Sequence, residues 1–180
     1  MNRWSPRSLT GEAIDDKALY TLFEAARWAP SAFNVQPWRF SFAKQGTESF
    51  ATYLDFLVEF NQSWARNASA LVVVISKTTT ITSQAEVDFP SHSFDTGAAW
   101  ASLALQAELL GWATHGMTGI DKEKIKRVLK LPENYVVEAV IAVGKQGDKD
   151  ALPEGLQAKE APSERRALND TVFEGVGFKE

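Results

Sequence analysis

The sequence has no cysteine and only two histidines, His92 and His115, among its 180 residues. The absence of thiols excludes disulfides, thiolate nucleophiles and thiolate metal sites. Two imidazoles also leave few ligands for a metal ion, so we expect no metal site and no metal-assisted catalysis. Any chemistry must therefore come from other groups.

Long hydrophobic runs are also missing. No uninterrupted apolar segment reaches the ~18 residues that suggest a membrane-spanning helix, and residues 1–6 lack an apolar signal region. We therefore expect a cytoplasmic protein with no membrane partner. The net charge of −4 and the pI near 5.3 argue against a nucleic-acid partner, although clustered arginines can still hold one small anionic ligand.

The composition and the length of the chain favour a single globular domain. The chain is 44% hydrophobic and 23% charged, which is a usual composition for a globular domain. Its length predicts a single domain over residues 1–180. From residue 145 the chain becomes polar and contains Pro153, Gly155 and Pro162. We expect residues 145–180 to form an extended arm rather than a second domain.

The chain is organised around residues 29–40, where a helix ends and a strand begins. Residues 18–28 carry apolar side chains on one stripe at helical spacing, and Pro30 ends that helix. After Pro37 the residues alternate between apolar and polar, as in a half-buried strand. The connection is either a ligand-binding loop or an ordinary capped turn, and the local pattern alone favours the turn. Its polar side chains are Ser31, Asn34 and Gln36.

Periodicity predicts the remaining elements. A continuous β-branched run at residues 70–75 predicts a central strand that is covered on both faces. The polar residues 78–90 are expected to be irregular. Apolar residues at helical spacing predict helices, and the alanine-rich one among them suits close contact between helices. These helices span residues 50–58, 94–110 and 122–129, and a further strand spans residues 136–144.

Arginines near both ends of the chain are candidate ligands for an anion. Arg3 and Arg7 flank Ser5 ahead of the first helix, where guanidinium groups can grip a phosphate bidentately. Arg165 and Arg166 form a basic pair within the predicted arm. Either pair alone is typical of a solvated terminus.

The glycine-bearing residues 111–121 end one element and begin another. Glycine lets backbone approach a planar ligand closely. His115 in this segment is a candidate general base, but a lone histidine in a loop is more often structural or ligand-lining. Asn61 is a further polar candidate, expected at the end of a helix.

Residues 25–40 closely resemble the AAR-APS-x-x-N-x-QPW-F signature of the FMN-dependent nitroreductase family. Other segments resemble further motifs of that family in the expected order: R-x-S-x-R at residues 3–7, D-x-G-A-A at residues 95–99 and H-x-M-x-G-F-D at residues 115–121. Each motif is weak alone, and together they are specific. The sequence departs from the opening motif's usual neighbours at Trp4 and Pro6.

The resemblance implies an α+β, nitroreductase-like fold with a central mixed sheet flanked by helices. It also implies an intertwined homodimer with FMN at each of two interface sites, with residues 145–180 contacting the partner subunit. NADH or NADPH would donate hydride, which would pass through flavin N5 to a nitroaromatic, quinone or related small-molecule acceptor. The flavin carries this chemistry, so no catalytic side chain is expected.

The same resemblance assigns cofactor-binding positions. Arg3 would meet the flavin ring, and Arg7 and Arg165 would meet the phosphate. Alternatives that remain open are a flavin-binding sensor without turnover, a flavin-dependent dehalogenase-like enzyme and a flavin-fragmenting relative. The full set of implied cofactor-binding residues is Arg3, Trp4, Ser5, Arg7, Ser31, Ala32, Phe33, Asn34, Gln36, Asn61, His115, Gly116, Thr118, Gly119, Arg165 and Arg166.

Overall fold

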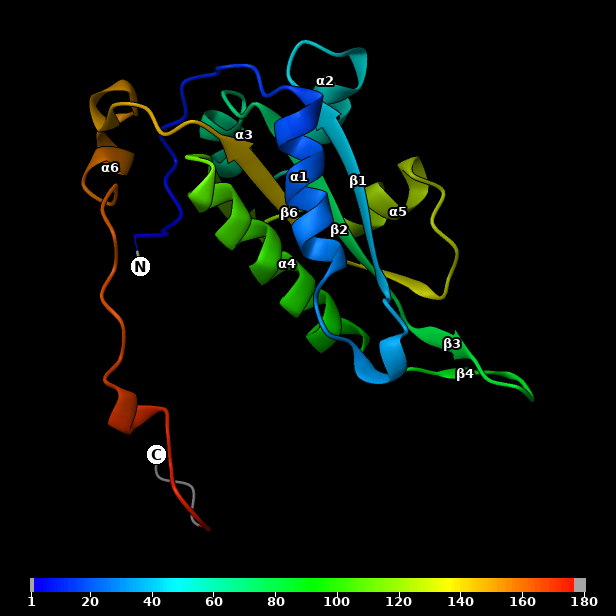
Figure 1. Cartoon of the computed structure of the whole chain (residues 1–180). Coiled ribbons are helices and arrows are strands. Elements are labelled where there is room, and N and C mark those ends of the chain that lie inside the picture. The colour runs from blue at the N-terminus through cyan, green and yellow to red at the C-terminus, as the bar shows by residue number, and fades with distance from the viewer. Residues whose placement is uncertain (1, 177–180) are drawn as a thin grey trace.

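The computed structural model describes residues 2–176 and contains a four-stranded sheet with helices on both faces (Figure 1). The predicted α+β class is confirmed. All three pairings between these strands are antiparallel, whereas a mixed sheet was expected. The connection that follows residue 117 returns to the same end of the sheet before residue 135, so the last two strands along the chain run antiparallel. The strands lie in the order β1 (Trp38–Lys44), β2 (Ala70–Lys77), β6 (Tyr135–Gly144) and β5 (Ala113–Met117).

Strand β2 is buried along almost its whole length, as the β-branched run predicted. Leu71, Val73 and Ile75 point into one core cluster, and Val72 and Val74 point into the other. This alternation follows from the two-residue period of a strand. Helices α1 (Asp16–Arg27) and α4 (His92–Leu109) cover the cluster that contains Val72. Helices α2 (Glu48–Leu54), α3 (Glu59–Ala65) and α5 (Lys122–Val128) cover the cluster that contains Leu71.

Helix α1 contains most of the helix predicted at residues 18–28, and it begins two residues earlier and ends one residue earlier. The Asp15 side chain accepts a hydrogen bond from the Ala18 N–H at 2.6 Å, and Asp16 lies in the first turn. Both features stabilise a helix amino-terminus. After Arg27 the chain passes through a short 3₁₀ turn, η1 (Ala32–Asn34), into β1.

The helix predicted at residues 50–58 is divided in the structure, because α2 ends at Leu54 and α3 begins at Glu59. The segment that connects β5 to α5 forms hydrogen bonds with the backbone at this break, and these replace the bonds of a continuous helix. The Asp121 N–H donates to the Phe56 carbonyl at 2.8 Å, and the Val58 N–H donates to the Gly119 carbonyl at 3.1 Å. Asn61 therefore lies in the first turn of α3, whereas it was expected at the carboxyl-terminal end of a helix.

Strands form in two segments for which the sequence predicted none. Residues 78–90 contain a hairpin of β3 (Thr79–Ile81) and β4 (Glu86–Asp88), in which Thr80 pairs with Val87. Within residues 111–121, β5 pairs with β6 along the sheet margin, so His115 lies on a strand and not in a loop. The glycine and the polar side chains of β5 hid the strand pattern.

The predicted arm leaves β6 and runs back past the amino-terminal segment (Figure 1). Gly147 donates its N–H to the Ser8 carbonyl at 2.9 Å, and Thr10 donates to the Lys145 carbonyl at 3.0 Å. Residues 177–180 of the predicted arm lie outside the described residues. The arm contains three short helical turns, η2 (Lys149–Ala151), α6 (Glu154–Gln157) and η3 (Leu168–Asp170).

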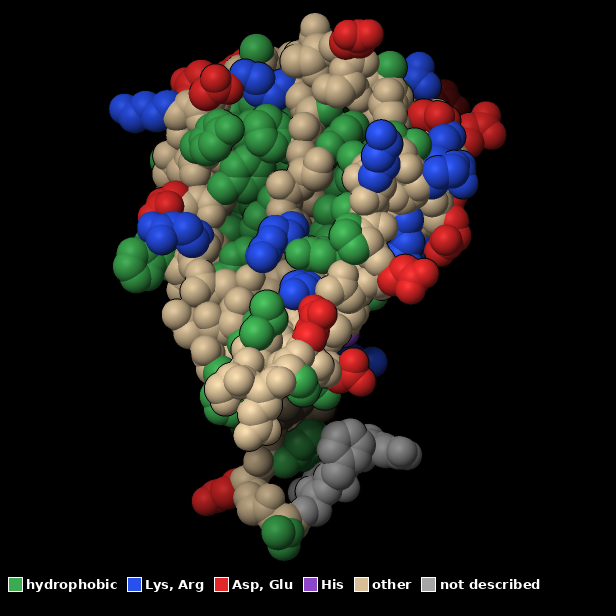
Figure 2. Space-filling view, turned by 90° about the vertical axis from the view of Figure 1, so that its right-hand side faces the viewer, with side chains coloured by type: hydrophobic (Ala, Val, Ile, Leu, Met, Phe, Trp, Pro, Cys, Tyr) green, Lys and Arg blue, Asp and Glu red, His purple; other side chains and the backbone are tan. Residues whose placement is uncertain are grey.

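An aromatic patch lies between α1 and β1. Tyr20 and Phe23 pack against Phe40 and Phe42, with ring centroids 5.3 to 6.1 Å apart. Figure 2 shows apolar side chains gathered on this side of the molecule. Among the described strands β1 pairs only with β2, so its other edge is open. Exposed apolar surface beside an open strand edge is typical of a contact surface.

None of the helices within residues 2–176 combines the length and the apolar character that crossing a bilayer requires.

Candidate functional site

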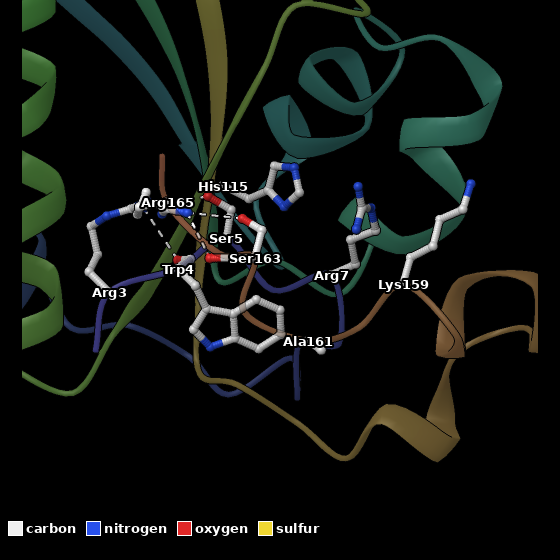
Figure 3. Close-up of a pocket in the computed structure, with 9 residues that line it drawn as sticks. All are labelled: Arg3, Trp4, Ser5, Arg7, His115, Lys159, Ala161, Ser163 and Arg165. Atoms are coloured by element: carbon white, nitrogen blue, oxygen red, sulfur yellow. Dashed lines mark hydrogen bonds between the residues drawn. The ribbon is translucent and has the colours of Figure 1, made fainter. Parts of the chain in front are cut away.

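A cationic cavity of about 310 Å³ lies between the amino-terminal segment, β5 and the arm (Figure 3). Four of its side chains carry positive charge, and no carboxylate is among the described residues that line it. The cavity brings together residues that are more than 150 positions apart in the sequence, because the arm returns past the amino-terminus. Its lining residues are Arg3, Trp4, Ser5, Arg7, His115, Lys159, Ala161, Ser163 and Arg165.

Arg7 has hydrogen-bonding capacity that the described chain leaves unused. Its Nε is buried and has no partner among the described residues. The nearby acid Glu160 does not neutralise it through an ion pair, since its Oε1 accepts backbone N–H bonds from Arg7 and Ser8 at 2.7 and 2.8 Å. A buried donor without an acceptor is costly, so Arg7 is suited to a ligand that supplies anionic oxygens.

Local backbone and hydroxyl groups hold the other two arginines of the cavity. Arg3 Nη1 lies 3.3 Å from the Trp4 carbonyl and 3.4 Å from Ser5 Oγ. Arg165 Nη1 donates to the carbonyl and to the hydroxyl of Ser163, both at 2.9 Å. Each of these bonds uses one nitrogen of a group that has five N–H donors. Both guanidinium groups therefore keep donors for a ligand.

His115 anchors the amino-terminal segment. Its Nδ1 lies 3.1 Å from the Pro6 carbonyl, so Nδ1 carries the proton and donates. The imidazole packs on the Trp64 ring with centroids 4.7 Å apart. Burial lowers the pKa of His115 below its usual value, and the Arg7 cation acts in the same direction, while the Pro6 carbonyl and Glu160 oppose them. The geometry favours a structural imidazole over a general base.

A second cavity of about 370 Å³ adjoins the cationic one through Arg3 and Ser5. Its other walls are mostly apolar and come from α4 and β5. A Cβ atom at Gly116 would lie 3.4 Å from the Trp100 ring, so β5 and α4 are in close contact here. The two cavities together suit an elongated ligand with an anionic end and a flat, largely apolar end. The further lining residues are Trp100, Ala101, Ala104, Leu105 and Gly116.

The predicted loop at residues 31–36 lies elsewhere, near the amino-terminal end of α4 (Figure 1). Phe33, Asn34 and Gln36 have φ angles of 52° to 55°, which are unusual for residues other than glycine. Ser31 Oγ accepts the Gln36 N–H at 3.0 Å, and the Ala32 N–H donates to buried Asp95 at 3.0 Å. Strained backbone of this kind, at ~1–3 kcal/mol per residue, clusters at functional sites.

This loop lines a separate, apolar groove of about 700 Å³ with the β3–β4 hairpin. Ala32, Phe33 and Val35 face the groove from the loop, and Phe33 is 98% exposed. None of the residues 31–36 lines the cationic cavity. Within one chain, the two halves of the predicted site are therefore apart.

Asn61, Thr118 and Gly119 line neither the cationic cavity nor its apolar neighbour. Asn61 Nδ2 donates to the Gly119 carbonyl at 3.1 Å. A Cβ at Gly119 would lie 2.8 Å from the same Asn61 nitrogen, so the need for glycine is already explained within the chain. Of the basic pair in the arm, Arg165 lines the cavity and Arg166 does not.

Four residues that help to build the site were not proposed for it from the sequence. Lys159 and Glu160 lie in a polar arm, where nothing distinguishes a buried acid from a solvated one. Trp100 and Asp95 belong to the alanine-rich helix, which the sequence assigned to packing. Within residues 2–176, no three histidine, aspartate or glutamate side chains are grouped as a metal site requires.

The paired cavities of this fold suit an elongated, anionic, flat ligand. The model of the Nitroreductase family matches residues 1–59 and 42–145 of the chain. The chain belongs to the nitroreductase family.

Individual relatives agree with this assignment. A crystal structure described as an oxidoreductase containing FMN has a TM-score of 0.96 and 46% identity, covering 99% of this chain and 90% of that one. A nitroreductase family protein from Streptococcus pneumoniae has a TM-score of 0.77 at 19% identity, with 96% of both chains covered, and shows the fold alone. An NADH dehydrogenase from Thermus thermophilus is 23% identical over 194 residues, which is 93% of this chain and 92% of the relative.

The lowered pKa of His115 predicts how stability changes with pH. The unfolded chain protonates this imidazole near pH 6.5, whereas the folded chain does so only at lower pH. The stability that the neutral imidazole contributes is therefore present above about pH 6.5 and lost as the pH falls through the folded value. Urea unfolding at about pH 7.5 and 5.5 should show a larger loss of stability for the wild type than for His115→Gln. Equal losses in the two proteins would contradict the assignment.

Proposed function

We propose that the protein is an FMN-dependent oxidoreductase that uses NADH or NADPH to reduce a nitroaromatic, quinone or related acceptor. The observation that carries this proposal is the buried, unpartnered Nε of Arg7, in a four-cation cavity that continues into an apolar one. A phosphate supplies the missing acceptors, and a flavin ring suits the apolar walls. FMN, when bound, supplies the flavin N5 that accepts hydride and passes reducing equivalents to the acceptor.

The side chains of this protein would bind and orient the cofactor. Arg7, Lys159 and Arg165 would neutralise the phosphate, since charged hydrogen bonds are the strong ones. Arg3 and Ser5 line both cavities, so they would meet the part of the cofactor that joins phosphate to ring, with the Arg3 guanidinium reaching the ring edge. Trp100 and Ala104 would cover the ring and exclude water.

FMN fits better than FAD. A cluster of cations around one small cavity suits a terminal monophosphate. A dinucleotide site of the common type needs a G-x-G-x-x-G turn after a strand, and the sequence has no such turn.

We further propose that the protein works as an intertwined homodimer. The two chains would form one domain, and the arm of each chain, residues 145–180, would contact the partner subunit. The outer face of α4 supports this, because Phe94 and Leu109 are 81% and 79% exposed on a helix whose opposite face packs in the core. Large exposed apolar surface marks a contact site. In such a dimer the partner's copy of the strained loop would complete each site, and Ser31, Asn34 and Gln36 would reach the cofactor.

The absorption spectrum of the purified protein tests the function. We expect a yellow protein whose flavin bands bleach when NADH or NADPH is added without oxygen and return when a quinone or nitroaromatic is added. Mass spectrometry of the released cofactor should identify FMN. Bound flavin without turnover would favour a sensor, and no flavin after reconstitution with FMN would contradict the proposal.

Replacing the two arm arginines should separate their roles. Arg165→Ala removes a cation that lines the cavity, and a hydrogen bond to a charged group is worth ~1.5–3 kcal/mol. We expect the dissociation constant for FMN to rise about 10- to 100-fold. Arg166→Ala, the matched control, should change it less than about twofold. Flavin fluorescence titration measures both, and equal effects in the two variants would argue against the assignment.

Mixing two defective variants tests whether the site is shared. Arg7→Ala and Asn34→Ala should each weaken FMN binding in the homodimer. In a mixed dimer, one site would collect both substitutions and the other would be intact, so refolding the two together should restore about a quarter of the sites. Each variant refolded alone is the control. No recovery on mixing would place both residues in one subunit's site.

A further inference from the structure

Glu160 is a buried acid at the back of the cationic cavity. It is 9% exposed, and its Oε1 accepts the N–H groups of Arg7 and Ser8 at 2.7 and 2.8 Å. It comes from the arm, 153 positions from Arg7. It does not line the cavity, so a bound ligand would not touch it.

The Glu160 carboxylate does not pair with the Arg7 guanidinium. An Arg7 guanidinium paired with Glu160 would have its charge and several donors used. Instead Glu160 bonds the backbone of the same residue, and Arg7 Nε remains buried without a partner among the described residues. The second oxygen of Glu160 is buried and unpartnered as well. Burying an acid at this cost is hard to explain by stability alone.

The backbone that Glu160 holds has little other support. Residues 3–7 lie outside any helix or strand of the described chain. His115 holds the Pro6 carbonyl, and the arm holds the backbone from Ser8 onwards. Within this segment the Arg7 N–H bonds Glu160 at 2.7 Å. Glu160 and His115 thus hold opposite sides of the Pro6–Arg7 peptide group, and Glu160 helps to set the direction in which the Arg7 side chain leaves the backbone.

We infer that Glu160 is a positioning residue that fixes the Arg7 backbone so that the Arg7 guanidinium meets the phosphate of the cofactor. This inference rests on the proposed FMN function. Glu160 acts through the main chain, which leaves the guanidinium free, and it ties the arm that carries Lys159 and Arg165 to the segment that carries Arg3 and Arg7.

Two effects of removing Glu160 have opposite signs, and this makes the inference testable. Loss of a negative charge near the cavity should by itself tighten the binding of an anion. Loss of the two backbone hydrogen bonds should weaken it by releasing Arg7. Positioning predicts weaker binding in Glu160→Ala, whereas simple electrostatics predicts tighter binding.

The experiment measures dissociation constants for FMN and for riboflavin, which lacks the phosphate, by quenching of flavin fluorescence in the full-length protein. We expect Glu160→Ala to weaken FMN about tenfold relative to riboflavin, a loss of about 1.4 kcal/mol. Glu160→Gln keeps an acceptor oxygen and should recover most of that loss. The matched control is Glu154→Gln, an exposed acid on the same arm, which should leave both constants unchanged.

A double-mutant cycle identifies the residue through which Glu160 acts. In an Arg7→Ala background, Glu160→Ala should no longer change the ratio of the two constants, because the guanidinium it positions is gone. A merely structural role would lower both affinities equally and would persist in that background. Where Glu160→Ala does not fold, Glu160→Asp replaces it. Aspartate keeps the charge but is too short to hold both N–H groups, so the dissociation constant for FMN should rise relative to that for riboflavin.

The outcomes separate this inference from the proposed function. A wild-type protein that binds no FMN overturns both. A wild type that binds FMN, with an unchanged ratio in Glu160→Ala or Glu160→Asp, overturns only the role of Glu160. Tighter FMN binding in both Glu160→Ala and Glu160→Gln would do the same and would assign the acid a purely electrostatic effect.

Discussion

Burial of β2 on both faces is the constraint from which the rest of the structure follows. A strand with Leu71 and Val73 on one side and Val72 and Val74 on the other needs a helical layer on each face. Helices α1 and α4 provide one layer, and α2, α3 and α5 provide the other. The polar residues of the cationic cavity lie mostly on the amino-terminal segment and on the arm, which run outside these two layers. The site is thus carried by irregular segments that pack against a rigid framework.

Irregular backbone carries the functional groups, and buried side chains from distant elements hold that backbone. Asp95 on α4 fixes the loop after α1 through the Ala32 N–H. His115 on β5 and Glu160 on the arm fix the amino-terminal segment through Pro6 and Arg7. Each contact uses a backbone group that has no partner in a helix or strand. Rigid elements therefore supply the order that these segments cannot supply themselves.

The sequence predicted the elements whose own residues determine them. The β-branched run of β2, the capped and proline-terminated α1 and the alanine-rich α4 all lie where expected, with ends shifted by one or two residues. Predictions were wrong where contacts between residues far apart in the sequence determine the local structure. The break between α2 and α3 depends on bonds from residues 119 and 121, and the β3–β4 hairpin depends on pairing between polar strands that lack an apolar alternation.

The candidate site was predictable as a set of motifs but not as an arrangement. The resemblance named Arg3, Ser5, Arg7 and Arg165, and these residues do line one cavity. It also named Ser31, Asn34 and Asn61, which the single chain keeps away from that cavity. Order along a sequence carries no information about which subunit a side chain would serve. Glu160 and Lys159 were missed because burial of an acid in a polar arm depends on what packs over it.

The positive charge of the cavity is the feature that favours an anionic ligand. The chain as a whole carries a net charge of −4, yet four cations surround one small space whose described lining has no carboxylate. Like charges held together oppose folding unless something neutralises them. The nearby acid Glu160 is turned to backbone N–H groups instead. An anionic ligand that binds only the folded state then stabilises it by mass action. A phosphorylated cofactor would therefore be a structural part of this protein as well as its reactive one.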